Sequence, residues 1–335
     1  MILITGGTGL LGSHLLLQLV ENYPSVRAIH RKESDLKRVE KVFGYYRENA
    51  PYLFKKIDWV ETDINDIPAL EKAFRGVTHV YHAAALISFD PANYKKLQKI
   101  NTEGTANIVN LCITHSIEKL CYASTVGAIG KSMDGAKTNE ENPWTPHEAN
   151  VYGLTKQAAE MEVWRGSQEG LEVVMVNPGV IIGPGFWDSG SGELFSIAKK
   201  GHRYHPPGGT GFVAVNDVVR LMIALMESDI KNERYIAVGE NWTYKKILGE
   251  ICKVFEITPP TKELKFWQLE IGRWFDWLGN LIFKSGRRIT KNAIRSLKNR
   301  EIYDTQKTKR DLGFEFTPLD GPIRFSCAQF KEENP

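Results

Sequence analysis

The chain has 335 residues, 42% of them hydrophobic and 25% charged, which is typical of a globular protein with a buried core and leaves room for one large or two smaller domains. The formal net charge is only +3, and its 43 basic and 40 acidic side chains are scattered among one another. This balance argues against a nucleic-acid-binding protein.

The first predicted element is a strand at residues 2–4, which runs into a glycine-rich turn and then a helix with an apolar stripe. Gly6 permits the tight turn, Gly9 lets a phosphate approach the backbone, and Gly12 lets helix and strand pack closely. Free N–H groups at the start of the helix attract an anion. The turn therefore predicts a site for a dinucleotide pyrophosphate, formed by Gly6, Thr8, Gly9, Leu10, Leu11 and Gly12.

The second predicted strand, residues 26–29, is followed by the basic residues Arg31 and Lys32. The residue at this strand end faces the adenosine ribose, where an acid binds the 2′-hydroxyl and a base accepts a 2′-phosphate. Arg31 offers a planar fork for a phosphate and Lys32 adds charge. The pattern favours NADP over NAD, and the alternative is a solvated basic loop.

Further strands are predicted at residues 57–61, 79–82, 119–123 and 171–177, separated by helical or polar sequence. Strands that alternate with helices indicate an α/β fold, a parallel sheet covered on both faces. Asp63 and Ile64 follow the third strand, near the expected adenine edge, and Ala83, Ala84 and Ala85 follow the fourth, where small side chains let the cofactor lie close. We expect His82 to be a hydrogen-bonded residue at a strand end and not a catalyst.

The candidate chemistry lies in Thr125, Tyr152 and Lys156. Residues i and i+4 share a helix face, so the Lys156 ammonium is expected beside the Tyr152 phenol, where it would lower the phenol's pKa from about 10. Tyr152 would then serve as general acid and base towards a carbonyl or alcohol, and Lys156 would also hold the nicotinamide ribose. Thr125 follows the fifth strand and would donate to the substrate oxygen, and the adjacent Ser124 is expected to contact the cofactor. Asn101 is expected on a helix that backs the active site and is included among the catalytic residues, with hydrogen bonding to backbone groups alone as the alternative.

In order, these segments resemble the extended short-chain dehydrogenase/reductase superfamily over about the first 220 residues. Segments 177–184 and 212–218 add to the likeness. The resemblance implies a Rossmann doubly wound sheet with a smaller, interleaved carboxyl-terminal domain. The NAD(P)-binding domain would comprise residues 1–177 plus about 211–238, and the substrate domain residues 178–210 plus about 239–335. It also implies hydride transfer at nicotinamide C4, with Tyr152, Lys156 and Thr125 as the catalytic set and with Pro178 and Val180 beside the nicotinamide.

Within this superfamily the chain looks most like the dihydroflavonol 4-reductase, cinnamoyl-CoA reductase and 3β-hydroxysteroid dehydrogenase group. That group implies an NADP-dependent reductase or dehydrogenase acting on a mainly hydrophobic small molecule. The alternative is an NAD-dependent nucleotide-sugar epimerase or dehydratase. Such enzymes typically carry an arginine near the position of Asn177 and an asparagine near that of Val180, and neither is present. A third possibility is a non-catalytic redox sensor that binds a partner protein.

An apolar pocket with one polar centre suits a hydrophobic ketone, aldehyde or secondary alcohol better than a diphosphate. Its expected lining is Leu86, Ile87, Phe89, Val126, Phe186, Trp187 and Tyr204. For any one of these aromatic residues, plain core packing is the alternative.

Segment 266–283 is rich in tryptophan and phenylalanine but carries Glu270, Arg273 and Asp276, which argue against a membrane-spanning helix. We expect it to cover the cleft or a neighbouring subunit, with a membrane-surface helix as the alternative. The four cysteines lack metal-ligand spacing, so we expect free thiols and no metal. A strand starting at residue 2 leaves no space for a leader, so we expect a cytoplasmic protein, either a monomer or a homodimer.

Overall fold

The computed structural model describes residues 1–132, 136–265, 267–269, 294 and 297–334. Of the aromatic segment 266–283 it describes only residues 267–269, so the prediction of a cleft-covering or membrane-surface helix falls outside the described residues.

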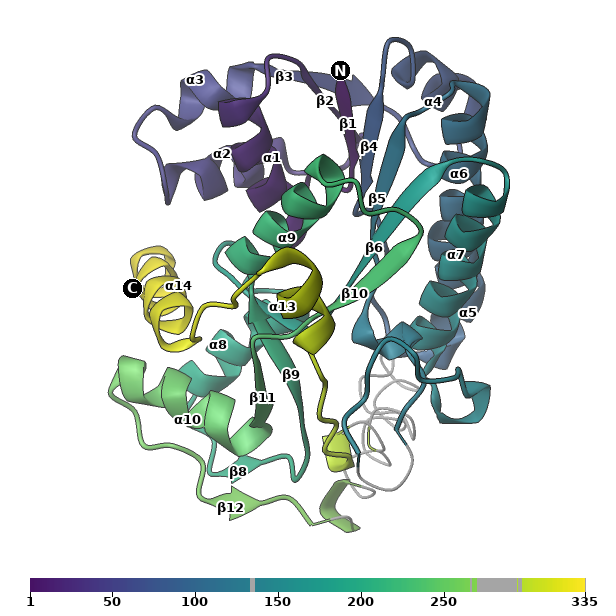
Figure 1. Cartoon of the computed structure of the whole chain (residues 1–335). Helices are drawn as coiled ribbons and strands as arrows, with labels where there is room; N and C mark the ends of the chain where they lie inside the picture. The colour runs from purple at the N-terminus through teal and green to yellow at the C-terminus, as the bar shows by residue number, and fades with distance from the viewer. Residues whose placement is uncertain (133–135, 266, 270–293, 295–296, 335) are drawn as a thin grey trace.

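A seven-stranded parallel sheet forms the centre of the molecule (Figure 1). Its strands, in spatial order, are β10 (Glu233–Ala237), β6 (Glu172–Pro178), β5 (Lys119–Ala123), β4 (His79–His82), β1 (Ile2–Thr5), β2 (Val26–His30) and β3 (Ile57–Glu61). The six strands predicted for this sheet are confirmed to within one residue at each end. The chain adds β2 and β3 on one side of β1 and β4 to β6 on the other, so the carboxyl ends of β1 and β4 flank the switch point where ligands bind in such folds.

Both faces of this sheet are covered, because side chains alternate along each strand. Ile2 and Ile4 pack into one core while Leu3 between them packs into the other. Helices α1 (Leu10–Asn22), α2 (Leu36–Gly44), α3 (Ala50–Lys55) and α9 (Val215–Glu227) cover the first face. Helices α4 (Ile67–Ala73), α6 (Gly104–Thr114) and α7 (Val151–Gln168) cover the second. This three-layer arrangement confirms the predicted α/β doubly wound fold.

Beyond β6 the chain builds a smaller unit with its own apolar core (Figure 1). A three-stranded sheet has the order β11 (Glu240–Thr243), β9 (Gly209–Ala214), β7 (Val180–Ile182), and β8 (Tyr204–His205) pairs with β12 (Lys262–Glu263). Helices α8 (Glu193–Lys199), α10 (Tyr244–Phe255) and α14 (Asp320–Glu333) pack on this unit, whereas α13 (Gln306–Leu312) contacts β10. Strand β9 pairs with β7 and β11 within this smaller sheet.

All four cysteines are buried and unpaired. Within the described ranges no helix has the length and apolarity to cross a bilayer. No cluster of three or more metal-ligating His, Cys, Asp or Glu side chains occurs in the same part of the chain.

Candidate active site

The glycine-rich turn between β1 and α1 is shaped by close backbone contacts. Gly6 has a φ of 75°, and a Cβ there would lie 2.5 Å from the backbone nitrogen of Ala84. A Cβ on Gly12 would lie 2.1 Å from the Gly6 carbonyl oxygen. A Cβ on Gly9 would meet nothing nearer than 3.5 Å, so the space beside Gly9 is open. Helix α1 begins there with no side-chain cap and no acid in its first turn. These features fit the pyrophosphate of a dinucleotide.

Arg31 and Lys32 follow β2 and are both exposed. The Arg31 backbone N–H donates to Ser34 Oγ at 3.1 Å and closes the turn. Its guanidinium makes no hydrogen bond or ion pair within the described residues. The Arg31 guanidinium is therefore available to bind a phosphate at the position where the adenosine ribose is expected.

The residues predicted at the adenine and ribose edge differ in what they contact. Asp63 Oδ1 accepts from the backbone N–H and the side-chain amide of Asn65, so it caps its own turn. Ile64 is buried and packs beneath Gly104. Ala83 and Ala84 donate to the backbone and hydroxyl oxygens of Thr5 and lie against the glycine-rich turn, while Ala85 is exposed.

His82 is a fully buried histidine with both ring nitrogens bonded, as predicted. Nδ1 lies 2.5 Å from Thr5 Oγ1 and Nε2 lies 2.9 Å from Thr105 Oγ1. Burial, assisted by the charge of Lys156, lowers the His82 pKa to about 3. The ring is therefore neutral at physiological pH and joins β1, β4 and α6.

A cavity of about 200 Å³ lies where α7 begins and β5 ends, with β7 and β9 on its far side. Thr125, Tyr152 and Val180 all line it, so the structure brings these three predicted residues together. The Tyr152 ring is half-buried and packs edge-on against Phe89, with 5.9 Å between centroids. A hydroxyl and a phenol thus share one partly apolar space.

Two of the seven residues expected to line the substrate pocket lie on this cavity, and the other five lie elsewhere. Phe89 and Val126 line it, whereas Leu86, Ile87, Phe186, Trp187 and Tyr204 do not. The loop after β7 turns away: the Arg38 guanidinium covers the Phe186 ring, and Trp187 packs edge-on against Phe195 and Phe330. Tyr204 lies on β8, which pairs with β12.

Sequence reasoning missed most of the far wall of the cavity. Trp144, Thr210, Tyr244 and Tyr303 line it, together with the ion pair of Lys131 and Glu301 at 2.7 Å. These residues come from segments widely separated in the chain, and no local pattern connects them.

Ser124 and Thr125 have different surroundings although they are adjacent. Ser124 is buried and its Oγ donates to Glu160 at 2.5 Å. Thr125 Oγ1 accepts from the Gly127 N–H at 3.2 Å and keeps its own proton free for a further acceptor on the cavity side. Of the two hydroxyls, Thr125 is thus the one on the cavity.

Lys156 does not lower the pKa of Tyr152 in this structure, so that expectation was wrong. Burial raises the pKa of the Tyr152 phenol, and no cation offsets it. The buried Lys156 ammonium instead donates to the Tyr122 phenol oxygen at 2.5 Å and to the Ala123 carbonyl at 2.8 Å. Tyr152 and Lys156 lie one turn apart on the same helix face, as expected. The Lys156 Nζ nevertheless points toward the sheet, because its two hydrogen-bond acceptors are on β5. Burial lowers the pKa of Lys156 to about 7.

Asn101 is buried in a π-helical turn, Gln98–Glu103, behind the site. Its side chain accepts from the Leu86 N–H at 2.8 Å and donates to the Leu86 carbonyl at 3.0 Å. The same Nδ2 donates to Thr155 Oγ1 at 3.1 Å. Asn101 therefore ties the loop after β4 to α7, which matches the backbone-satisfying alternative.

A buried acid that the sequence analysis overlooked lies one turn after Lys156. Glu160 accepts from Ser124 and Asn177 through Oε1 and from Arg234 through Oε2. Its spacing of four residues from Lys156 on one helix face is a signal that could have been found in the sequence.

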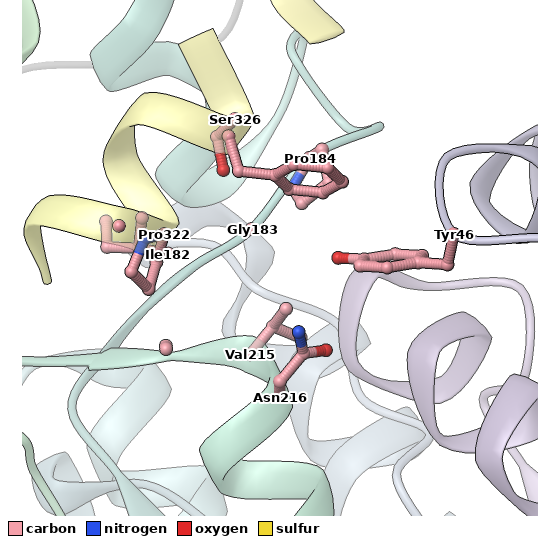
Figure 2. A pocket seen from close by; sticks show the side chains of 11 residues that line it. Tyr46, Ile182, Gly183, Pro184, Val215, Asn216, Pro322 and Ser326 are labelled. Atoms are coloured by element: carbon pink, nitrogen blue, oxygen red, sulfur yellow. The ribbon is translucent and has the colours of Figure 1, made fainter. Parts of the chain in front are cut away.

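A second cavity, of about 240 Å³, lies between the loop after β7, the start of α9 and helix α14 (Figure 2). Tyr46 points its phenol into the space faced by Pro184 and Asn216, and Ser326 borders it from α14. Burial raises the pKa of Tyr46. None of Thr125, Tyr152 and Lys156 lines this cavity, so it is not the candidate catalytic site.

The sequence pattern of the NAD dependent epimerase/dehydratase family matches residues 2–239. The chain belongs to this family. It is accordingly an NAD(P)-dependent enzyme of the extended short-chain dehydrogenase/reductase type, and the resemblance found in the sequence is confirmed.

Relatives within this epimerase/dehydratase family include oxidoreductases. The chain is 28% identical to Sterol demethylase protein B of Methylococcus capsulatus, covering 98% of both chains. It is also 28% identical to a putative dihydroflavonol 4-reductase of Synechocystis, covering 92% of this chain and 88% of the relative.

Solved structures of similar fold cover the whole chain. The crystal structure of gox2253 has a TM-score of 0.82 at 25% identity and covers 100% of this chain and 98% of that one. A UDP-glucose 4-epimerase of Thermotoga maritima, solved with UDP-glucose, has a TM-score of 0.75 at 22% identity, covering 100% and 99%. The second likeness shows the fold alone.

Proposed function

We propose that this enzyme is an NADP-dependent oxidoreductase that transfers a hydride between nicotinamide C4 and the carbonyl or secondary alcohol of a mainly hydrophobic small molecule. The observation that carries the proposal is the meeting of Tyr152 and Thr125 on one cavity, beside Val180. A phenol and a hydroxyl are the two donors that a carbonyl oxygen needs as it gains negative charge.

The cofactor, when bound, supplies the hydride. Gly6, Gly9 and Gly12 with the start of α1 would hold its pyrophosphate, and Lys156 would hold the nicotinamide ribose. Pro178 and Val180 lie at the end of β6 and the start of β7, where the proposal sets the nicotinamide. Ser124 contributes by anchoring the end of β5 and not by a free hydroxyl.

Tyr152 is protonated at neutral pH, because burial raises the pKa of its phenol. It is therefore ready to give its proton to the oxygen of a carbonyl substrate, which is the direction of reduction. Thr125 keeps its proton and donates a hydrogen bond to the same oxygen, which stabilises the developing charge. Tyr152 then regains a proton from solvent, while Lys156, whose ammonium is directed to β5, acts by holding the nicotinamide ribose.

NADP is proposed as the cofactor because Arg31 and Lys32 are exposed at the end of β2. The Arg31 guanidinium has no partner in the described part of the chain, and a 2′-phosphate would give it one. The next acid along, Glu33, is also exposed, so a binding measurement with both cofactors is needed to test this assignment.

The substrate class is inferred from the cavity walls. Phe89, Val126, Ile129, Trp144 and Tyr303 give it an aromatic and aliphatic lining, and one ion pair lies among them. Flat, ring-containing ketones or alcohols fit such walls. Names of relatives, including Sterol demethylase protein B, Vestitone reductase and 3 beta-hydroxysteroid dehydrogenase type 7, support the same class.

The second candidate is an NAD-dependent nucleotide-sugar epimerase or dehydratase, favoured by the fold shared with a UDP-glucose 4-epimerase. Asn177 and Val180 stand where such enzymes carry their sugar-nucleotide residues, and the Asn177 amide is used internally, on Thr125 and Glu160. Mass spectrometry of the nucleotide that copurifies separates the two candidates, since an epimerase retains NAD tightly.

The proposed function is tested by incubating the enzyme with NADPH and a panel of polycyclic ketones and aldehydes. We expect NADPH oxidation with at least one compound and none with UDP-glucose. Turnover of UDP-glucose without net cofactor oxidation would assign the second candidate instead.

A further inference from the structure

Glu160 is a buried carboxylate to which the proposed chemistry gives no part. It lies on α7 one turn after Lys156, and only 1% of its surface is exposed. Removing an ionised carboxylate from water costs several kcal/mol, which only good hydrogen bonds and a counter-charge repay. A carboxylate in this position therefore requires an explanation.

The donors to Glu160 come from the ends of β5 and β6 and from the neighbouring edge strand. Ser124 Oγ and Asn177 Nδ2 each lie 2.5 Å from Oε1. Arg234 Nη1, on β10, lies 3.1 Å from Oε2. One carboxylate thus joins the helix that carries Tyr152 and Lys156 to the sheet edge that faces the cavity.

The same network reaches the backbone of Thr125. Asn177 Nδ2 donates to the Thr125 carbonyl at 3.0 Å as well as to Glu160. The Thr125 hydroxyl is carried on a segment that has just left β5. Glu160 holds this segment in place through its hydrogen bonds with Asn177 and Ser124, and so fixes the position of the Thr125 hydroxyl relative to Tyr152.

Glu160 lies one helical turn from Lys156 and acts on it through its charge, although the ion pair that Glu160 makes is with Arg234. Lys156 donates to Tyr122 on β5 and acts through its charge on His82 on β4, and Tyr152 lies one turn earlier on the same helix. These three are neutral at physiological pH, since burial raises the pKa of both phenols and lowers that of the imidazole. Among the acids of the described residues, Glu160 alone raises the Lys156 pKa against the lowering by burial.

On its other side Glu160 meets the Arg234 guanidinium, which also donates to the backbone carbonyl of Glu140. The Glu140 carboxyl accepts from the Ile236 N–H and so faces β10. Burial raises the pKa of Glu160, and the hydrogen bond from Ser124 and the charge of Arg234 act in the opposite direction and favour the ionised form.

We propose that Glu160 is a positioning residue of the active site: its carboxylate keeps the Lys156 ammonium charged and holds the segment that carries Thr125 in place. The inference rests on the proposed oxidoreductase function, in which Lys156 and Thr125 act. The contacts of Lys156 and Thr125 taken separately do not reveal this role of Glu160.

The test replaces Glu160 by glutamine, which removes the charge and keeps the size. Glu162→Gln is the matched control, since it removes the same charge from the same helix at a side chain that pairs with Arg165. The pH titration of Lys156 is followed by NMR in protein labelled with ¹³C-lysine, its signal assigned by its loss in Lys156→Arg. We expect the Lys156 midpoint to move to lower pH in Glu160→Gln and to stay in place in Glu162→Gln. An unchanged midpoint in Glu160→Gln would overturn the proposal.

Glu160→Asp separates the two parts of the role, because it keeps the charge but shortens the reach to Ser124 and Asn177. With a compound turned over by the wild type, we expect both Glu160 variants to lose about tenfold or more in kcat with little change in the KM for NADPH. The alkaline limb of the rate should move to lower pH in Glu160→Gln only. A merely structural residue would lower the unfolding temperature in both variants and leave that limb unmoved.

If Glu160→Gln does not fold, Glu160→Asp carries the test alone: wild-type kcat in that variant contradicts the proposal, and a reduced kcat at an unchanged unfolding temperature supports it. The NMR titration needs no substrate. A wild type that turns over nothing in the panel therefore counts against the proposed function, while the Lys156 midpoint still decides the role of Glu160.

Discussion

Lys156 donates to the Tyr122 phenol oxygen at 2.5 Å, and its ammonium lies 4.1 Å from the centre of the Tyr122 ring. The Tyr122 ring in turn stacks on His82, with 5.4 Å between centroids. The cation is thus held from the sheet side by neutral aromatic groups. Tyr152, one turn earlier on the same helix, is left facing the cavity.

Replacing Tyr152 by phenylalanine removes the proton donor and keeps the ring contact with Phe89. We expect kcat for carbonyl reduction to fall about 10²-fold to 10⁴-fold, the usual worth of a general acid, with NADPH affinity unchanged. Steady-state kinetics and NADPH fluorescence titration measure the two effects. Tyr204→Phe, at an exposed tyrosine on β8, is the control and should keep the wild-type rate. Full activity in Tyr152→Phe would remove Tyr152 from the mechanism.

Gly9→Ala tests the pyrophosphate site without disturbing the fold. Gly9 has a φ of −99°, which alanine adopts freely, and its Cβ would have no protein contact closer than 3.5 Å. That methyl group would instead fill the space for the phosphate, so we expect NADPH affinity to fall about tenfold or more at an unchanged unfolding temperature. Gly249→Ala, with nothing within 4 Å, is the matched control. Unimpaired NADPH binding in Gly9→Ala would place the cofactor elsewhere.

Arg31→Gln tests the choice of cofactor. A charged hydrogen bond to phosphate is worth about 1.5–3 kcal/mol, so we expect NADPH to bind about 10-fold to 100-fold more weakly. NADH affinity should stay the same, because NADH has no 2′-phosphate. Calorimetry with both cofactors gives the answer, and Lys253→Gln on α10 removes an equal charge far along the chain as a control. Equal losses for NADPH and NADH would refute a 2′-phosphate contact.

The pH dependence of reduction should follow Lys156. Burial lowers its pKa to about 7, so the ammonium is present below that pH and is lost above it. Tyr152 stays protonated over the same range, because burial raises its pKa. We therefore expect kcat to fall as pH rises through about 7, and Lys156→Arg to move that fall to higher pH. A rate that climbs steadily with pH would contradict this assignment.

The large sheet could be predicted because its information is local. Buried parallel strands appear as short apolar runs, and the glycine-rich turn marks its own helix start. Strand β10 was missed because Glu233–Ala237 begins with two charged residues that pair at the sheet edge, Glu233 with Lys307 and Arg234 with Glu160.

The parts of the candidate site that lie on a single helix or strand end could be predicted, whereas the parts formed where several elements meet were missed. Tyr152 and Lys156 follow from spacing on one helix, and Thr125 from its place after a strand. The direction in which the Lys156 ammonium points could not be predicted, because it depends on Tyr122 and Ala123 on β5. The cavity lining could not be predicted for the same reason: Trp187 packs against the core of the smaller unit, while Tyr244 and Tyr303, from distant segments, line the cavity.

The most direct test of the account supplies NADPH carrying deuterium at both C4 positions, together with a ketone that the enzyme reduces, and examines the product by mass spectrometry and NMR. The account predicts one deuterium on the new carbinol carbon and a hydroxyl proton derived from solvent by way of Tyr152. A product without deuterium at that carbon would contradict hydride transfer from nicotinamide C4 at this site.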